Sequence, residues 1–199
     1  MIKNKNINIM KEIRGGIFSV IVAICIVSIV NSKVLANVKV EQSSMDNTLH
    51  DGQHLIVNKL NYNFSEPKRG DIIIFLENCK KGTIVEDTME NIRSILGKKN
   101  NNNNRLVKRV IGVSGDEVDI KDGVVYLNNE KLDEPYAKGE TISNDFKLPI
   151  TVSEGKLFVL GDNRAVSRDS RKFGLIDCNQ VEGSASFRVY PFDEIGSIK

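Results

Sequence analysis

Leu106-Val107-Lys108-Arg109-Val110-Ile111 is the stretch that decides how this 199-residue chain is expected to fold. Its apolar and β-branched residues favour a strand, and side chains along a strand point alternately to the two faces of a sheet. Lys108 then lies on the face of Leu106 and Val110, and Arg109 lies on the opposite face. The stretch therefore predicts a strand with a lysine on its apolar face, although alternation alone leaves a solvated strand lysine as the alternative.

Short β-rich runs on both sides of this strand are bounded by turn residues. They span residues 54–57, 71–76, 106–113, 117–120, 123–127 and 156–160, with turns at 121–123 and 127–129. Runs of this length and composition are typical of strands. The chain is long enough for one core and too short for two ordinary enzyme domains, so we expect one folded unit that is mostly β.

One polar segment interrupts this pattern, and we expect a variable polar insertion around residues 77–104. Asp87 and Glu90 match a capping box, and apolar residues recur after them at helical spacing, which predicts a short helix at 88–96. Five asparagines follow at 100–104, and such a low-complexity tract is typical of a surface loop.

The N-terminal segment has the pattern of a membrane anchor. Residues 15–32 are eighteen residues without a charge, and as a helix they span roughly 27 Å, against ~30 Å for a bilayer core. The basic residues before them place the N-terminus in the cytoplasm, with only Glu12 opposing Lys3, Lys5, Lys11 and Arg14. We expect a cytoplasmic N-terminus at 1–14, a single transmembrane helix at 15–36 and an extracytoplasmic domain at 37–199.

A cleavable secretory signal is the alternative for this segment, because Val34-Leu35-Ala36 loosely match a small-residue cleavage site. Either interpretation exports the rest of the chain. Cys79 and Cys178 would then meet an oxidising compartment, where they either pair or stay free. Three cysteines, with Cys25 in the apolar segment, are no disulfide framework, so we expect two free thiols.

A histidine-based site is poorly supported by the sequence. His50 and His54 have no recognisable Ser/His/Asp setting, and His54 begins a strand, so the two side chains do not share a helical face that could bind a metal. A hydrolase would need another base. Lysine can serve if burial lowers its pKa from about 10.4 toward 7 or 8.

Four motifs together resemble the type I signal peptidases, which are membrane-anchored Ser/Lys proteases. Residues 43–49 (SSMDNTL) are similar to their S-M-x-P-T-L nucleophile motif, and residues 69–75 (RGDIIIF) to their R-G-D strand. Residues 108–116 (KRVIGVSGD) resemble the motif of the general base, and residues 161–174 (GDNRAVSRDSRKFG) the G-D-N-R-x-x-S-x-D-S-R-x-x-G signature. All four stand in the family's order.

The resemblance implies a role for each matching residue. Ser44 would be the nucleophile, Lys108 the base that removes its proton, and Ser167 the hydroxyl that orients the lysine amine. The Ser44 backbone N–H would donate to the oxyanion, with the Gln42 amide as a candidate second donor. The remaining matches would brace the site through charge pairs and turns: Asp162, Arg164, Asp169 and Arg171. The resemblance implies no metal and no organic cofactor.

The implied activity is removal of signal peptides from exported preproteins, with cleavage after small residues in an A-x-A pattern. The implied partners are those signal peptides and the lipid bilayer; we expect a monomer, and the net charge of +2 gives no nucleic-acid footprint.

Three positions depart from the family pattern: Asn47 and Ser114 replace prolines, and Gln42 replaces a small residue. They leave open a relative specialised for pilin-like substrates. A non-catalytic assembly chaperone is the other alternative, which the intact Ser44, Lys108 and Ser167 argue against. The soluble Ser/Lys autoproteases of DNA-damage repressors share the chemistry, but this chain has an apolar segment in place of a DNA-binding domain.

Overall fold

The computed structural model describes residues 2–77, 105–143 and 146–198, and it leaves the side chains of 2–11, 28–33 and 63–64 undescribed. The chain divides into two compact units, residues 1–34 with 82–99, and residues 35–81 with 100–199. The predicted helix at 88–96, the asparagine tract and Cys79 lie outside the described residues.

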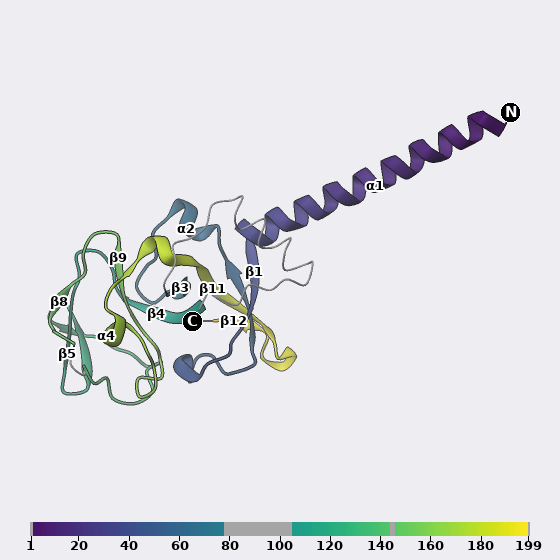
Figure 1. The fold of residues 1–199 in the computed structure, drawn as a ribbon. Helices are drawn as coiled ribbons and strands as arrows, with labels where there is room; N and C mark the ends of the chain where they lie inside the picture. The colour runs from purple at the N-terminus through teal and green to yellow at the C-terminus, as the bar shows by residue number, and fades with distance from the viewer. Residues whose placement is uncertain (1, 78–104, 144–145, 199) are drawn as a thin grey trace. The chain divides into compact units, whose positions relative to one another are not determined.

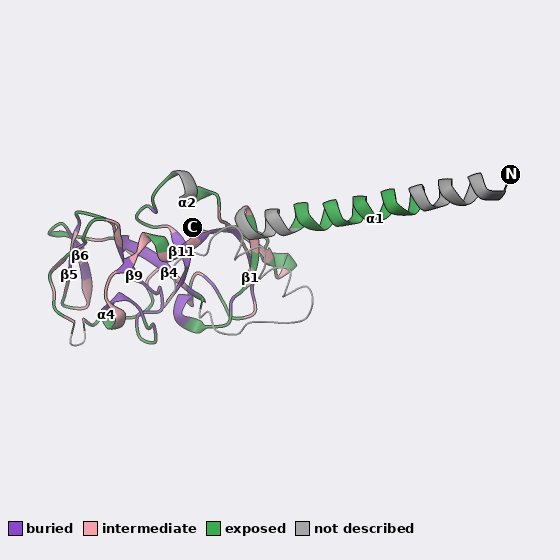
Figure 2. Cartoon of the chain, turned by 45° about the horizontal axis from the view of Figure 1, so that its top comes forward, coloured by how far each residue is buried: buried purple, intermediate pink, exposed green. Residues whose placement is uncertain are grey.

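In the first unit, helix α1 runs from Ile2 to Lys33. Its side chains are exposed throughout residues 12–27, and its large apolar residues from Ile13 to Val27 are 39% to 68% exposed. Figure 2 colours this stretch of the helix as exposed. Within the part of the chain that the structure describes, no helix is at once long enough and apolar enough to cross a membrane. The anchor at 15–36 therefore stays a prediction.

The second unit is built on an antiparallel sheet of eight strands (Figure 1). In spatial order the strands are β1 (Leu35–Lys39), β2 (His54–Asn58), β11 (Val181–Tyr190), β3 (Ile72–Leu76), β4 (Arg105–Gly112), β9 (Lys156–Leu160) and β10 (Ile176–Asp177), with β12 (Gly196–Ser197) paired to β11. The last long strand of the chain therefore lies inside the sheet, between β2 and β3. Leu35 and Ala36, which end the predicted anchor, belong to β1.

A smaller antiparallel sheet has the order β7 (Glu130–Lys131), β6 (Val124–Leu127), β5 (Glu117–Lys121) and β8 (Ile150–Thr151). Its apolar residues Val118 and Val125 pack in one buried cluster with Phe158 and Leu160 of β9. Short helical turns connect the strands: η1 (Ser43–Met45), α2 (Asn61–Phe64), α4 (Ser170–Phe173), η2 (Cys178–Gln180) and η3 (Phe192–Glu194).

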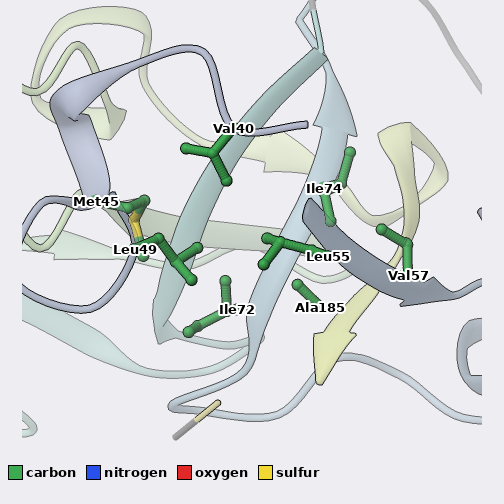
Figure 3. Close-up of a cluster of buried hydrophobic side chains, with 8 residues drawn as sticks. All are labelled: Val40, Met45, Leu49, Leu55, Val57, Ile72, Ile74 and Ala185. Atoms are coloured by element: carbon green, nitrogen blue, oxygen red, sulfur yellow. The ribbon is translucent and has the colours of Figure 1, made fainter. Parts of the chain in front are cut away.

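Two further clusters form the core of the large sheet. One joins the loop of η1 to the sheet, because Met45 and Leu49 pack with Leu55 and Ile72 (Figure 3). The other contains Ile73, Phe75, Leu106, Val110 and neighbouring residues of β9, β10 and β11. The core therefore lies on both faces of β3, all of whose residues are buried.

The mostly β fold is confirmed, and each of the six predicted runs contains a strand. Strand β11 was missed, because its sequence VEGSASFRVY has small and polar residues where a buried strand usually has large apolar ones. Gly183 is required there, since a Cβ atom would lie 2.5 Å from the carbonyl oxygen of Asn58 on β2. Cys178 is a free thiol whose pKa is raised by burial.

Candidate active site

Ser44 and Lys108 meet in the interior of the second unit. The Lys108 side chain leaves β4 on the face of Leu106 and Val110, as the alternation predicted, and Ile73 of β3 is its partner in the sheet. Its Nζ atom donates a hydrogen bond of 2.7 Å to Ser44 Oγ. Lys108 is 1% exposed and Ser44 8%. The solvated strand lysine that alternation had left open is thereby excluded.

Burial lowers the pKa of the Lys108 amine to about 8, because the charged form is poorly solvated there. The carboxylates of Asp169, Asp162 and Glu77 act in the opposite direction, and Arg168 acts in the same direction as burial. A second hydrogen bond, of 2.9 Å, runs from Nζ to the carbonyl oxygen of Val107. A substantial fraction of the amine is therefore neutral near pH 8, within hydrogen-bonding distance of a serine hydroxyl.

The backbone of Ser44 is held from two sides. Met45, the next residue, is 1% exposed and packs in the cluster shown in Figure 3. Asn163 binds from the other side, since its N–H donates to the Ser44 carbonyl and its side-chain amide donates to the Ser43 carbonyl, both at 3.1 Å. Asn163 belongs to the signature at 161–174, yet sequence reasoning gave it no role. Asn163 is far from Ser44 in the sequence, so no local sequence pattern predicts their contact.

Ser167 lies close to this backbone but makes no hydrogen bond to Lys108 in the structure. Its Oγ is buried and has no hydrogen-bond partner among the described residues. A Cβ atom at Gly161 would lie 2.2 Å from Ser167 Oγ and 2.4 Å from the Ser44 carbonyl oxygen. Gly161 is thus the point where the two serines approach each other, and any side chain there would separate them.

Arg109, on the other face of β4, organises the surroundings of the Ser44 loop. It donates through Nε (2.9 Å) and Nη2 (2.8 Å) to the two carboxylate oxygens of Asp162, and its guanidinium lies 3.9 Å from the ring centre of Tyr136. Thr48 donates to the same carboxylate at 2.5 Å. Asp162 was predicted to brace the site, but Thr48 and Tyr136 were missed because each is distant in sequence from its partners.

The other three predicted bracing residues form buried ion pairs. Arg171 donates to both carboxylate oxygens of Asp169 at 2.8 Å, and Asp169 also accepts from the Gly161 N–H at 3.1 Å. Arg164 donates to the Gly161 carbonyl at 3.0 Å and pairs with Glu134 at 2.6 Å. Gly161 is therefore fixed through both its backbone groups, and Glu134 is a further partner that the sequence did not indicate.

The remaining candidates lie at the edge of the site. Gln42 precedes η1 in an extended conformation, is exposed and makes no capping hydrogen bond to that turn. His50 Nδ1 lies 2.7 Å from an Asp46 carboxylate oxygen, and Lys138 Nζ donates to the other at 2.6 Å. The hydrogen bond from Lys138 lowers the pKa of Asp46 most, and the hydrogen bond with His50 lowers it further. His54 lies on β2, where its ring packs edge-on against Tyr190.

The turn that follows Ser44 has a conformation that proline cannot adopt at its third residue. The Thr48 N–H donates to the Met45 carbonyl at 3.0 Å, and Asp46 has φ −60° and ψ 132°. Asn47 has φ +106°, which is the pattern of a type II turn. Its side-chain amide donates to the Tyr136 carbonyl at 2.9 Å. Where the S-M-x-P-T-L motif has proline, this chain thus has a φ angle that proline cannot adopt.

Comparison with known proteins gives consistent matches. A family model described as signal peptidase, peptidase S26, matches residues 13–190. Signal peptidase IB of Staphylococcus aureus (strain COL) is 36% identical over 200 residues, covering 92% of this chain and 93% of the relative. Signal peptidase I of Bacillus caldolyticus is 38% identical over 196 residues, covering 92% of this chain and 95% of the relative.

A crystal structure of a signal peptidase I from Enterococcus faecalis V583 aligns with a TM-score of 0.44 and 30% identity, covering 61% of this chain and 98% of that chain. The sequence matches span nearly the whole chain and include the positions of both Ser44 and Lys108.

The conformation of Asn47 predicts that restoring the motif's proline is harmful in this chain. Asn47→Pro should lower the thermal midpoint of the full chain in detergent by about 4–10 °C. Proline fixes φ near −65°, and it also removes the hydrogen bond from the Asn47 side-chain amide to the Tyr136 carbonyl. Asn47→Gly keeps the required φ and loses only that bond, so we expect a fall of about 2–4 °C. A proline variant as stable as the glycine variant would contradict the assigned turn.

Proposed function

Because the chain belongs to the signal peptidase family, peptidase S26, it is a serine endopeptidase that removes signal peptides from preproteins, and we propose that Ser44 and Lys108 perform the cleavage. The observation that carries the proposal is the 2.7 Å hydrogen bond between Lys108 Nζ and Ser44 Oγ in a buried setting. A nucleophile within reach of a base that burial keeps partly neutral is the arrangement that acyl transfer requires.

In the proposed mechanism the neutral Lys108 amine takes the proton of Ser44 Oγ as this oxygen attacks the scissile carbonyl carbon. The tetrahedral oxyanion accepts from the Ser44 N–H, and the Gln42 amide is the candidate second donor. The Lys108 ammonium then gives its proton to the leaving amine, which leaves an acyl ester on Ser44. A water molecule then attacks the ester carbonyl while Lys108 takes one of its protons, and the Lys108 ammonium gives this proton to Ser44 Oγ as the C–O bond breaks and the carboxylic acid product leaves.

Ser167 is proposed to orient the Lys108 amine during these proton transfers. A lysine ammonium has three N–H donors, and two of them are directed at Ser44 Oγ and the Val107 carbonyl. The unpartnered Ser167 hydroxyl, close to Ser44 at Gly161, is a suitable acceptor for the third. Asp162, Arg164, Asp169 and Arg171 are proposed to hold this geometry without contacting the reacting atoms.

The substrate is proposed to bind as an extended peptide whose small side chains, in an A-x-A pattern, precede the scissile bond. Alternate side chains of such a strand face the same side, so the first and third residues before the bond would be selected together. Burying a lysine amine is energetically unfavourable. A chaperone role without catalysis would give no reason for the burial of Lys108 beside Ser44.

We further propose that residues 15–36 anchor the chain in the cytoplasmic membrane, with residues 1–14 in the cytoplasm and a monomeric catalytic domain at 37–199 outside. The uncharged stretch lies within the continuous helix α1, whose large apolar side chains are exposed from Ile13 to Val27. Apolar side chains exposed along a helix in this way favour contact with lipid. The anchor would hold the site where signal peptides leave the bilayer.

Removal of either member of the proposed pair should abolish cleavage of a preprotein by the full chain in detergent. We expect Ser44→Ala and Lys108→Ala each to lower kcat/KM by at least about 10⁴-fold, and the double variant to lose no more, because the two residues act as one unit. Ser43→Ala, which changes the neighbouring serine, is the matched control and should retain activity. A Lys108→Ala enzyme that cleaves near the parent rate would exclude the mechanism.

The pKa of Lys108 predicts the pH profile of kcat/KM. With a free-enzyme pKa of about 8, the neutral base is lost as pH falls, so activity should decline about tenfold per pH unit below 8 and level off above it. Replacing His50 and His54 by Gln should leave the midpoint unmoved, whatever it does to the plateau. A midpoint that moves in this double variant would show that histidine carries the proton.

Protease accessibility tests the proposed anchor. Protease added to intact spheroplasts should digest residues 37–199 while a tag at the N-terminus stays protected, and detergent should expose the tag as well. We expect this pattern because the basic residues before the apolar stretch keep the N-terminus in the cytoplasm. The proposal fails if the domain is protected in intact spheroplasts, or if it is released into the medium by cleavage after Ala36.

A further inference from the structure

Among the described residues, three carboxylates act on the Lys108 amine, and each of them is paired with an arginine. The pairs are Asp169 with Arg171, Asp162 with Arg109, and Glu77 with Arg168. A bare carboxylate near a lysine stabilises the ammonium form, which cannot act as a base. Pairing each carboxylate with a guanidinium offsets part of this effect.

The third pair differs from the other two in its exposure. Arg171 and Arg109 are buried like their carboxylates, whereas the Arg168 side chain is 60% exposed and that of Glu77 is 9% exposed. A largely buried carboxylate thus depends on an arginine that remains in contact with water. Removing Arg168 alone leaves the Glu77 carboxylate without its partner, whereas replacing both residues removes the two charges together.

The pair also connects two parts of the proposed site. Glu77 follows β3 four residues after Ile73, which is the sheet partner of Lys108, so the alternation of β3 turns Glu77 to the same face as Lys108. Arg168 directly follows Ser167. The ion pair therefore ties the Ser167 loop to the end of the strand beside the base.

We propose that Arg168 is a positioning residue for the cleavage reaction, which offsets the effect of the Glu77 carboxylate on the charge of Lys108. This inference rests on the proposed function of Ser44 and Lys108. Arg168 occupies a position that the signature at 161–174 leaves free, so the motif alone assigns it nothing.

The direction of the electrostatic effect is fixed by the charges that face the base. Asp169, Asp162 and Glu77 raise the pKa of Lys108, and Arg168 lowers it. Loss of Arg168 leaves Glu77 unpaired, so the ammonium form gains stability and the acidic limb of kcat/KM moves to higher pH. Loss of Glu77 moves the acidic limb to lower pH. When both charges are lost, the two displacements nearly cancel.

The experiment measures kcat/KM against pH for the full chain in detergent at low ionic strength. Arg168→Gln should move the acidic limb up by about half a pH unit, a roughly threefold loss at a fixed pH on the limb, with little change in the plateau. Glu77→Gln should move it down by about the same amount, and the double variant should lie near the parent. Arg168→Lys keeps the charge and should leave the limb in place.

Arg105 offers a matched control. Its side chain is 48% exposed, it pairs with Glu182, whose side chain is 12% exposed, and it projects from the face of β4 opposite to Lys108. Arg105→Gln should leave the limb unmoved. In high salt the displacement in Arg168→Gln should shrink, because mobile ions then screen the exposed side of the pair.

A purely structural ion pair gives a different result. It would lower the plateau in Arg168→Gln and Glu77→Gln alike and leave both limbs in place, and this outcome overturns the proposal. Should Arg168→Gln fail to fold, the limb of Glu77→Gln still decides between the two. Failure of the proposed function is a separate result, since it appears as activity that survives Lys108→Ala.

Discussion

The burial of the Lys108 amine against Ser44 is the constraint on which the rest of the site depends. An amine in contact with water would be almost fully protonated at neutral pH and could not accept a proton. Lys108 lies on β4, which has β3 and β9 as its neighbours in the sheet, and its side chain is buried against Ser44. The same burial makes every nearby carboxylate important, because charges interact strongly where water is excluded.

The surrounding ion pairs can be understood as a response to this constraint. Asp162 and Asp169 fix the backbone near Gly161 and the loop of Ser44 through good hydrogen-bonding geometry. As free anions they would hold the base in its protonated form. Bidentate arginines allow them to keep their structural contacts with a reduced effect on Lys108. Rigidity and a usable base thereby coexist in one small region.

Sequence reasoning was successful where the signal is local. The alternation in β4 placed Lys108 and Arg109 on opposite faces, and the turn-bounded runs located six strands. It failed where the determinant is a distant partner. Strand β11 has no large apolar face, Tyr136 and Glu134 act through arginines that are distant in sequence, and the approach of Ser167 to Ser44 at Gly161 exists only in three dimensions. The proline positions of the motif likewise did not reveal the φ of Asn47.

The position of β11 bears on when the enzyme becomes active during its own synthesis. The loop of Ser44 leads into β2, and Lys108 lies on β4 beside β3, while β11 is the strand that joins β2 to β3. Residues 181–190 are synthesised after both Ser44 and Lys108. A nascent chain without them holds Ser44 and Lys108 in two groups of strands that share no edge. The sheet therefore brings Ser44 and Lys108 together only after β11 has been synthesised and inserted between β2 and β3.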